Sequence, residues 1–329
     1  MPPIFSLRRR SLSLAVVGLS SLLLSSGASQ AQTYPNRPIT LIVAAPAAGP
    51  SDNLARAMAE GLSKELGQSV VVDNRPGANG VIGGELAKRA APDGYTLHMT
   101  WIGNATSRAL SPKSTLDINK DFVHITQMVY AANILVANPA SGFKTLKDLM
   151  QYAKANPGKL SYASSGNGSS GHLAMEMLKQ RAGLDIVHVP YKGGAPALND
   201  VLAGQLPIMF INQDAVIPFA KTGKLVSLAI TSPTRNPVFP DVPAVQEAGL
   251  PGFEATAWAG LSAPAGTPRA VVDRIHAAAV KVMQGPFRGK QEATGAVVVA
   301  SSPEQFAAFV QRETDNWTQV IRTAGITAD

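Results

Sequence analysis

Short runs of apolar, β-branched residues alternate with amphipathic stretches along most of this 329-residue chain. Ile39–Ala44 and Ser69–Asp73 have the composition of buried strands, and residues with helical spacing follow each of them. Such alternation predicts an α/β fold, with parallel or mostly parallel sheets that helices cover on both faces. The same pattern predicts further strands at 95–100, 122–137, 160–164, 186–190, 207–212, 224–230 and 258–263.

The N-terminus has the three parts of a secretory signal peptide. Arg8–Arg10 are followed by an uncharged run rich in Leu, Ser and Val, and then by the small residues Ser29 and Ala31. The apolar run is short of the roughly 20 apolar residues that a membrane span needs, which argues against an uncleaved anchor. We therefore expect residues 1–31 to be a signal peptide that is cleaved near Ala31, which leaves an exported protein; the family resemblance described below implies that it is periplasmic.

The composition excludes several classes of site. The chain has no cysteine, so it has no disulfide, no thiol nucleophile and no cysteine-ligated metal. Its five histidines stand far apart, without the H-x-x-x-H spacing of a metal site. Part of the formal charge of +7 comes from the arginines of the signal peptide, and no long Lys/Arg run follows them. We expect no metal, no cofactor and no nucleic-acid partner.

The segment Ser164–Leu173, SSGNGSSGHL, has glycines at the G-x-G-x-x-G spacing of dinucleotide-binding loops. That interpretation also needs an acidic residue at the end of the next strand. Asp185 lies at the right distance but precedes strand 186–190, so it stands at the wrong end. A Gly/Ser loop before a helix instead exposes N–H and hydroxyl donors where the helix dipole favours an anion. We therefore interpret this segment as an anion-binding loop.

The same segment leaves an enzymatic alternative open. Gly168–Gly171, GSSG, is one residue short of the G-x-S-x-G motif of serine hydrolases, and Ser169 or Ser170 would be the nucleophile. His172 is too close in sequence to be the usual distant base. An exported serine hydrolase or esterase is therefore the alternative to a binding protein. Because no acid–base pair is evident, we expect the chain not to be an enzyme.

Three other loops at predicted strand ends carry polar candidates. Pro46–Asp52 combines a glycine, which allows close backbone approach, with a serine that can cap the following helix. Asn74–Gly80, NRPGANG, has the composition of a tight, irregular turn. Ile211–Asp214, INQD, offers amide groups and one carboxylate. Each of these features also has an ordinary structural interpretation as a turn or a helix cap.

Taken together and in this order, these segments resemble one family. From about Tyr34 to the C-terminus, the chain resembles the Bug family, the extracytoplasmic solute receptors of tripartite tricarboxylate transporters. The motifs that carry the resemblance are YPNRPITLIV, GPSDNLARAMAEGLSKELGQSVVVDNRPGANGVIGG, APDGYTL, SYASSGNGSSGHLA, HVPYKGGAPALNDVLAGQ and PDVPAVQEAGLPGFEATAWAGLSAPAGTP.

This resemblance implies a fold and a function. The fold is a two-lobed, hinged periplasmic binding protein of the type II-like class, with its ligand in the cleft between the lobes. Lobe 1 would hold residues 33–132 and 257–329, and lobe 2 residues 133–256. The function is capture of a small carboxylate, a dicarboxylate or an aromatic acid, by a monomer. The implied partners are the membrane subunits of a transporter or a sensor protein.

The resemblance also maps ligand-binding residues onto the loops. The first lobe would contribute Ala48, Gly49, Ser51, Asp52, Asn79 and Gly80, and the second lobe Ser164, Ser165, Gly168, Ser169, Ser170, Asn212 and Asp214. The first loop departs from the family's usual P-F-x-x-G-G pattern, because Ala45 stands where the family commonly has Phe. A small residue there predicts room for a larger or aromatic ligand, and the sequence leaves the identity of the carboxylate open.

Overall fold

The computed structural model describes residues 34–219 and 222–327 of the chain. The signal peptide predicted at 1–31 lies outside these residues. The chain divides into a short N-terminal unit that ends at Asn36 and a compact unit, Arg37–Asp329. The described part of the first unit contains no helix or strand. In the part of the chain that the structure describes, no helix is long and apolar enough to span a membrane.

The second unit is built on one mixed sheet of ten strands in the described ranges. Its first half consists of the parallel strands β2 (Val70–Asn74), β1 (Ile39–Val43) and β3 (Thr96–Trp101), followed by antiparallel β9 (Thr256–Pro264). The apolar runs predicted from the sequence form β1, whose Ile39, Leu41 and Val43 are fully buried. The helices of this half are α2 (Pro50–Leu66), η1 (Ala78–Gly80), α3 (Val81–Lys88), α4 (Ile102–Leu110), α8 (Arg269–Gln284), α9 (Pro286–Glu292) and α10 (Pro303–Ala324).

The second half of the sheet has its own parallel core. Strand β5 (Leu160–Ser164) pairs in parallel with β6 (Ile186–Pro190) and β7 (Ile208–Asn212). Strand β8 (Val226–Ile230) lies beyond them in the chain. The helices of this half are η2 (Pro139–Ser141), α5 (Leu146–Ala155), α6 (Ser170–Ala182), α7 (Gly194–Leu202), η3 (Gln213–Ala215) and η4 (Ile217–Phe219).

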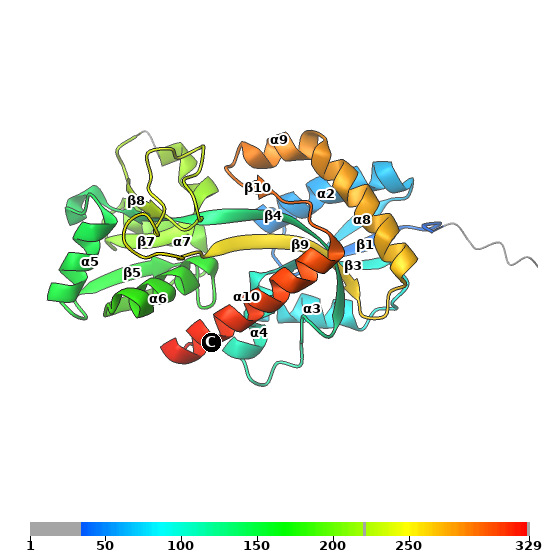
Figure 1. Cartoon of the computed structure of the whole chain (residues 1–329), viewed down its shortest axis with the longest axis horizontal. Coiled ribbons are helices and arrows are strands. Elements are labelled where there is room, and N and C mark those ends of the chain that lie inside the picture. The colour runs from blue at the N-terminus through cyan, green and yellow to red at the C-terminus, as the bar shows by residue number, and fades with distance from the viewer. Residues whose placement is uncertain (1–33, 220–221, 328–329) are drawn as a thin grey trace, which may run out of the picture. The chain divides into compact units, whose positions relative to one another are not determined.

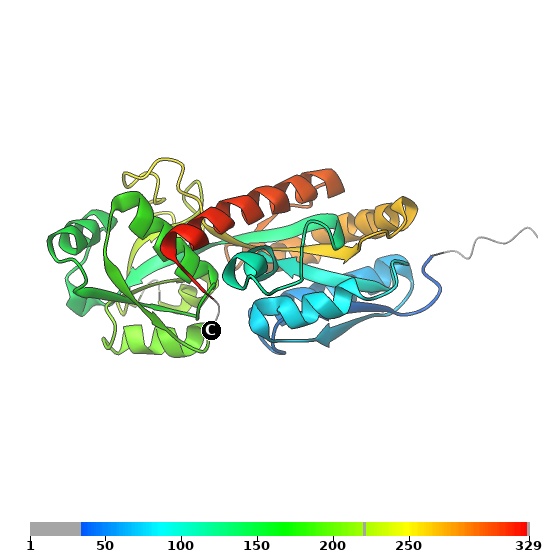
Figure 2. The same ribbon diagram turned by 90° about the horizontal axis from the view of Figure 1, so that it is seen from below.

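One long strand, β4 (Phe122–Ala137), belongs to both halves (Figure 1). Its residues up to Ala132 pair antiparallel with β9, and from Asn133 onward it pairs with β7 and β8. The two-residue strand β10 (Val297–Val298) also pairs with β4. Helix α10 runs along the sheet and packs against α4 and β4 in the first half and α6 in the second (Figure 2).

The predicted strand positions are confirmed, but the predicted strand directions hold only in part. Among the strand pairs of the described residues, those within β1–β3 and β5–β7 are parallel, whereas every pair that includes β4 or β9 is antiparallel. Helical crossovers produce the parallel pairs. Residue pattern alone does not distinguish them from the antiparallel pairing of β4 with the distant β9, because both kinds of strand are apolar and buried here.

Candidate functional site

Three helices begin at one cavity of about 390 Å³, which we call the cleft cavity. Pro50 and Ser51 start α2, Trp101 precedes α4, and Ser169 and Ser170 start α6. Each helix follows a strand of the sheet, so the N-termini meet where the strands end. Free N–H groups and helix dipoles at such ends favour a bound anion. The remaining lining residues are Leu54, Asn79, Ile102, Val129, Ala131, Ser165, Asn167, Asn212, Asp214, Ala257, Trp258, Ala259, Gln291, Thr294 and Ala296.

Asp52 holds the loop before α2 in place. Its carboxylate accepts hydrogen bonds from the backbone N–H of Ala48 (2.8 Å), from Arg56 Nε (2.9 Å) and from Asn74 Nδ2 (2.9 Å). Ala48 has φ of 63°, a conformation that a non-glycine residue adopts only when its surroundings impose it. The Arg56 hydrogen bond is the main reason that the pKa of Asp52 falls to about 2. Asp52 therefore positions the loop as a buried anion and does not reach the cavity itself.

A run of left-handed residues brings Asn79 to the cavity. Gly77, Ala78, Asn79 and Gly80 all have positive φ, so the chain turns sharply before α3. Asn104 of α4 supports this turn, because its Nδ2 donates to the Gly80 carbonyl (3.1 Å) and its Oδ1 accepts from the Trp101 N–H (3.1 Å). The predicted tight turn at 74–80 thus exists, and a hydrogen bond from Asn104 of the neighbouring helix α4 holds its end at Gly80.

Two donors on this wall are buried without a partner. Asn79 Nδ2 and Trp101 Nε1 make no hydrogen bond within the described residues, although both atoms are buried. Both residues line the cleft cavity. An unpaired buried donor costs about 1–3 kcal/mol, so proteins rarely keep one without a reason. Neither atom is exposed to the cavity in this conformation, so a ligand oxygen reaches them only if the two side chains turn toward it.

The second wall is the loop that leads into α6. Ser169 caps the helix by accepting from the His172 N–H, and the Gly168 N–H donates to His172 Nδ1 (3.0 Å). His172 therefore presents an unprotonated Nδ1, and burial lowers its pKa to about 3. A Cβ at Gly171 would collide with the Phe210 carbonyl, and Gly166 and Gly168 have positive φ. Turn geometry and close packing thus account for the G-x-G-x-x-G spacing without a nucleotide.

Ser170 and the end of β7 complete this wall. Ser170 Oγ lies within hydrogen-bond distance of Asn133 Oδ1 (3.1 Å) and Asn212 Oδ1 (3.3 Å). Asn133 is the point at which β4 changes from β9 to β7, so the hydroxyl links the helix start to that junction. Asp214 follows two residues after β7 and is half-buried. It is the only charged side chain among the described residues that line the cleft cavity.

The structure brings together part of the predicted set of ligand-binding residues. Ser51, Asn79, Ser165, Ser169, Ser170, Asn212 and Asp214 line the cleft cavity. Ala48, Gly49, Asp52, Gly80, Ser164 and Gly168 stand behind it and shape the loops. Ser164, for example, is fully buried and lies 2.6 Å from His188 Nε2. Ala45 does not line the cavity, so the space expected from that position is not part of it.

Sequence reasoning missed the aromatic walls. Trp101 and Trp258 both line the cleft cavity, and Gln291 and Thr294 approach it from the region of α9. Trp258 Nε1 donates to Glu313 Oε2 (2.8 Å), so a residue of α10 that does not line the cavity fixes the orientation of this ring. A tryptophan at the end of one strand and another within a distant strand give no local signal of a shared site.

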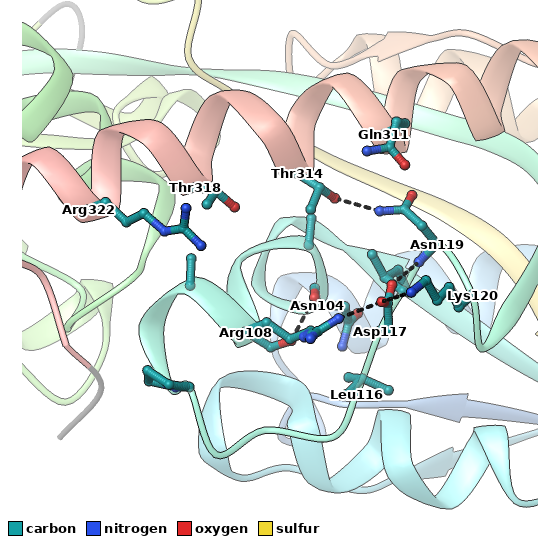
Figure 3. Close-up of a pocket in the computed structure, with 15 residues that line it drawn as sticks. Asn104, Arg108, Leu116, Asp117, Asn119, Lys120, Gln311, Thr314, Thr318 and Arg322 are labelled. Carbon is teal, nitrogen blue, oxygen red and sulfur yellow. Dashed lines mark hydrogen bonds and ion pairs between the residues drawn. The ribbon is translucent and has the colours of Figure 1, made fainter.

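A larger cavity of about 600 Å³, which we call the α10 groove, lies between α10 and residues 104–120 (Figure 3). Its charged side chains largely satisfy one another: Arg108 pairs with Asp117 (2.6 Å), and Lys120 Nζ lies 3.9 Å from the same carboxylate. Asn119 donates to Thr314 Oγ1 (3.2 Å). No buried unpaired donor faces this groove in the described part of the chain. The cleft cavity is therefore the better candidate site, although it is smaller.

Comparison with known proteins decides the family. Residues 54–326 match the model of the tripartite tricarboxylate transporter family receptors. The chain belongs to this receptor family. The solved structure of the periplasmic binding protein BugD is 34% identical, with a TM-score of 0.77 over 89% of this chain and 99% of that one. The resemblance to Bug receptors and the two-lobed α/β fold of a periplasmic binding protein are thereby confirmed.

Two further relatives were solved with carboxylates. Rpa4515 of R. palustris, solved with adipate, is 33% identical with a TM-score of 0.80 over 89% of this chain and 99% of that one. MatC of Rhodopseudomonas palustris, solved with malate, is 32% identical with a TM-score of 0.77 over 88% of this chain and all of that one. These family receptors are binding proteins, and both ligands are small carboxylic acids.

Proposed function

We propose that this receptor captures a small carboxylate in the periplasm and presents it to the membrane subunits of a tripartite tricarboxylate-type transporter. The observation that carries the proposal is the meeting of three helix N-termini and two unpaired buried donors at one cavity. These groups can bind an anion with neutral donors alone. The adipate and malate of the two relatives support a carboxylate as that anion. Export through a signal peptide cleaved near Ala31 is part of the same proposal.

The cavity supports binding better than catalysis. Ser169 accepts a hydrogen bond from a backbone N–H, and Ser170 donates toward two asparagine oxygens. None of these partners is a base that could take the proton of a serine nucleophile. The Ser164 hydroxyl does contact a histidine, but Ser164 is fully buried and does not line the cavity. The hydrolase alternative therefore gains no support from these contacts.

We further propose that the ligand is held by closure of two lobes, residues 33–132 with 257–329 and residues 133–256. The change of partner along β4 between Ala132 and Asn133 supports this division. Across it, Gln213 Nε2 donates to the Thr294 carbonyl (3.1 Å) and Asn236 Nδ2 to the Gly295 carbonyl (2.7 Å). These amide contacts would stabilise the closed arrangement beside the junction of the lobes. A ligand-induced decrease in radius of gyration in X-ray scattering is the expected sign of closure.

Thermal unfolding with a panel of carboxylates tests the function. A ligand at about 100 times its dissociation constant adds roughly 2.7 kcal/mol of stability. We expect a selective shift with one class of acid, its loss in Asn79→Ala, and its retention in Arg322→Ala, which alters the α10 groove. A shift with NAD alone, or hydrolysis of esters that requires Ser169, would overturn the proposal.

A further inference from the structure

The cleft cavity carries a charge that a receptor for dianions would not need. Asp214 comes from the second half of the sheet, whereas the unpaired donors of Asn79 and Trp101 come from the first half. The Asp214 side chain makes no hydrogen bond or ion pair within the described residues. No Lys, Arg or His lines the cavity among those residues. The site therefore combines donors that lack an acceptor with an acceptor that lacks a donor.

We propose that the ligand is a monocarboxylate with a hydrogen-bond donor, an amino or hydroxyl group, at the end that meets Asp214. This inference rests on the proposed function and specifies its substrate class. The ligand's carboxylate accepts from the helix N-termini, and from Asn79 Nδ2 and Trp101 Nε1 once these two side chains turn toward it. Its amino or hydroxyl group donates to Asp214, so the unpaired groups of Asn79, Trp101 and Asp214 at this cavity all obtain partners.

The charges also discriminate against a dicarboxylate. A second carboxylate would meet Asp214 in a partly desolvated cavity without a cation between them, and like charges repel strongly there. The site thus rejects diacids by an unfavourable contact as well as selecting the donor by a favourable one. Apolar side chains, among them Leu54, Ile102 and Val129, line the same cavity, so the spacer between the two ends of the ligand is hydrocarbon.

Calorimetric titration with acids of equal length tests this inference. The six-carbon set is 6-aminohexanoate, 6-hydroxyhexanoate, hexanoate and adipate, and the four-carbon set is 4-aminobutanoate, 4-hydroxybutanoate, butanoate and succinate. In the wild-type protein we expect the best amino or hydroxy acid to bind at least tenfold more tightly than the diacid of the same length. The plain monocarboxylate should bind more weakly than the donor-bearing acid.

The variant Asp214→Asn keeps the size of the side chain and removes its charge. We expect it to lose at least tenfold in affinity for the amino acid and to gain affinity for the diacid, so that the preference inverts. Asp214→Ala should show the same loss and guards against a new contact from the amide, while Arg322→Ala should leave all affinities within twofold. Circular dichroism establishes that each variant is folded.

The outcomes separate this inference from the proposed function. If the wild type binds a diacid as tightly as the amino and hydroxy acids, and Asp214→Asn changes these affinities by less than twofold, the inference is wrong and carboxylate capture stands. If no acid of either set binds the wild type, carboxylate capture itself is contradicted, and the inference with it.

Discussion

The two cavities of this protein differ in how their polar groups are satisfied. The α10 groove is the larger, and its ion pairs and the Asn119–Thr314 hydrogen bond occupy most of its polar atoms. The cleft cavity is smaller, yet within the described residues it has buried donors without acceptors and a carboxylate without a donor. Because leaving buried polar groups unpaired is costly, unpaired donors beside a cavity are more informative than its volume.

The largest expected effect comes from the contact between the cleft walls. A Cβ at Gly168 would lie 2.5 Å from Leu110 Cδ1 of α4 and 2.9 Å from Asn79 Nδ2 of η1, two elements that belong to the first half. Gly168→Ala should therefore displace Asn79, hinder closure and weaken ligand binding at least tenfold. The left-handed φ of 73° adds a folding cost of about 1–2 kcal/mol.

Gly183→Ala is the matched control for this variant. Gly183 ends α6 with a similar φ of 63°, and a Cβ there would meet nothing within 4 Å. It should show the same loss of stability in urea unfolding but unchanged ligand affinity in titration calorimetry. Equal loss of affinity in both variants would show that backbone strain, and not the contact between the walls, is responsible.

The pH dependence of stability tests the buried state of three histidines that lie outside the lining of the cleft cavity. Burial is the main reason that the pKa of His172 falls from 6.5 to about 3, and it also lowers the pKa of His98 to about 3 and of His124 to about 4. The unfolded chain therefore binds protons that the folded protein does not, starting below about pH 6.5. The contribution of these neutral histidines to the free energy of unfolding should be fully present above that pH and should decrease toward pH 3–4. At pH 5 the loss should be about 2 kcal/mol per histidine.

Urea unfolding at pH 7.5, 6 and 5 measures this dependence. His172→Asn removes one titrating group and keeps an acceptor for the Gly168 N–H. It should reduce the loss of stability between pH 7.5 and 5 by about the share of one histidine, while the loss due to His98 and His124 remains. An unchanged pH profile in this variant would contradict the neutral, buried state of His172.

A smaller effect should distinguish the two tryptophans of the cleft. Trp101→Phe removes a donor that has no partner among the described residues, so the unliganded protein should lose no hydrogen bond, while ligand affinity falls about three- to tenfold. Trp258→Phe removes a donor to Glu313, whose pKa burial raises, and should lower the free energy of unfolding by about 1–2 kcal/mol. Calorimetric affinities and urea unfolding of both variants measure the contrast, and a loss of affinity confined to Trp258→Phe would reverse our assignment.

The smallest effect is expected in the α10 groove. The exposed Arg322 makes no ion pair within the described residues. Arg322→Ala should change the free energy of unfolding by less than about 0.5 kcal/mol. It should also leave ligand affinity within twofold. A clear loss of carboxylate binding in this variant, measured by titration calorimetry, would move the ligand from the cleft cavity to the α10 groove.

Local pattern was sufficient for most elements and failed where contacts are distant. The apolar stretch 122–137 was predicted as strand and is β4. The local capping residues Ser302 and Gly325 bound α10 in the same way. Helix α4 was not predicted, because Gly103, Thr106 and Ser107 are weak helix formers. Its position is determined by packing against α10 and the turn at 78–80.

The amino-acid sequence by itself determined the strand–helix alternation, the Gly/Ser loop before α6 and the resemblance to the receptor family. Those properties depend on residues that are neighbours in the chain, or on motifs that can be compared one by one. Only the tertiary structure decided that Asn79, Trp101, Trp258 and Asp214 share one cavity, and that two of the donors there have no partner in the part of the chain that the structure describes. Whether a polar atom is satisfied depends on every segment that packs around it, and residues far apart in the chain supply those segments.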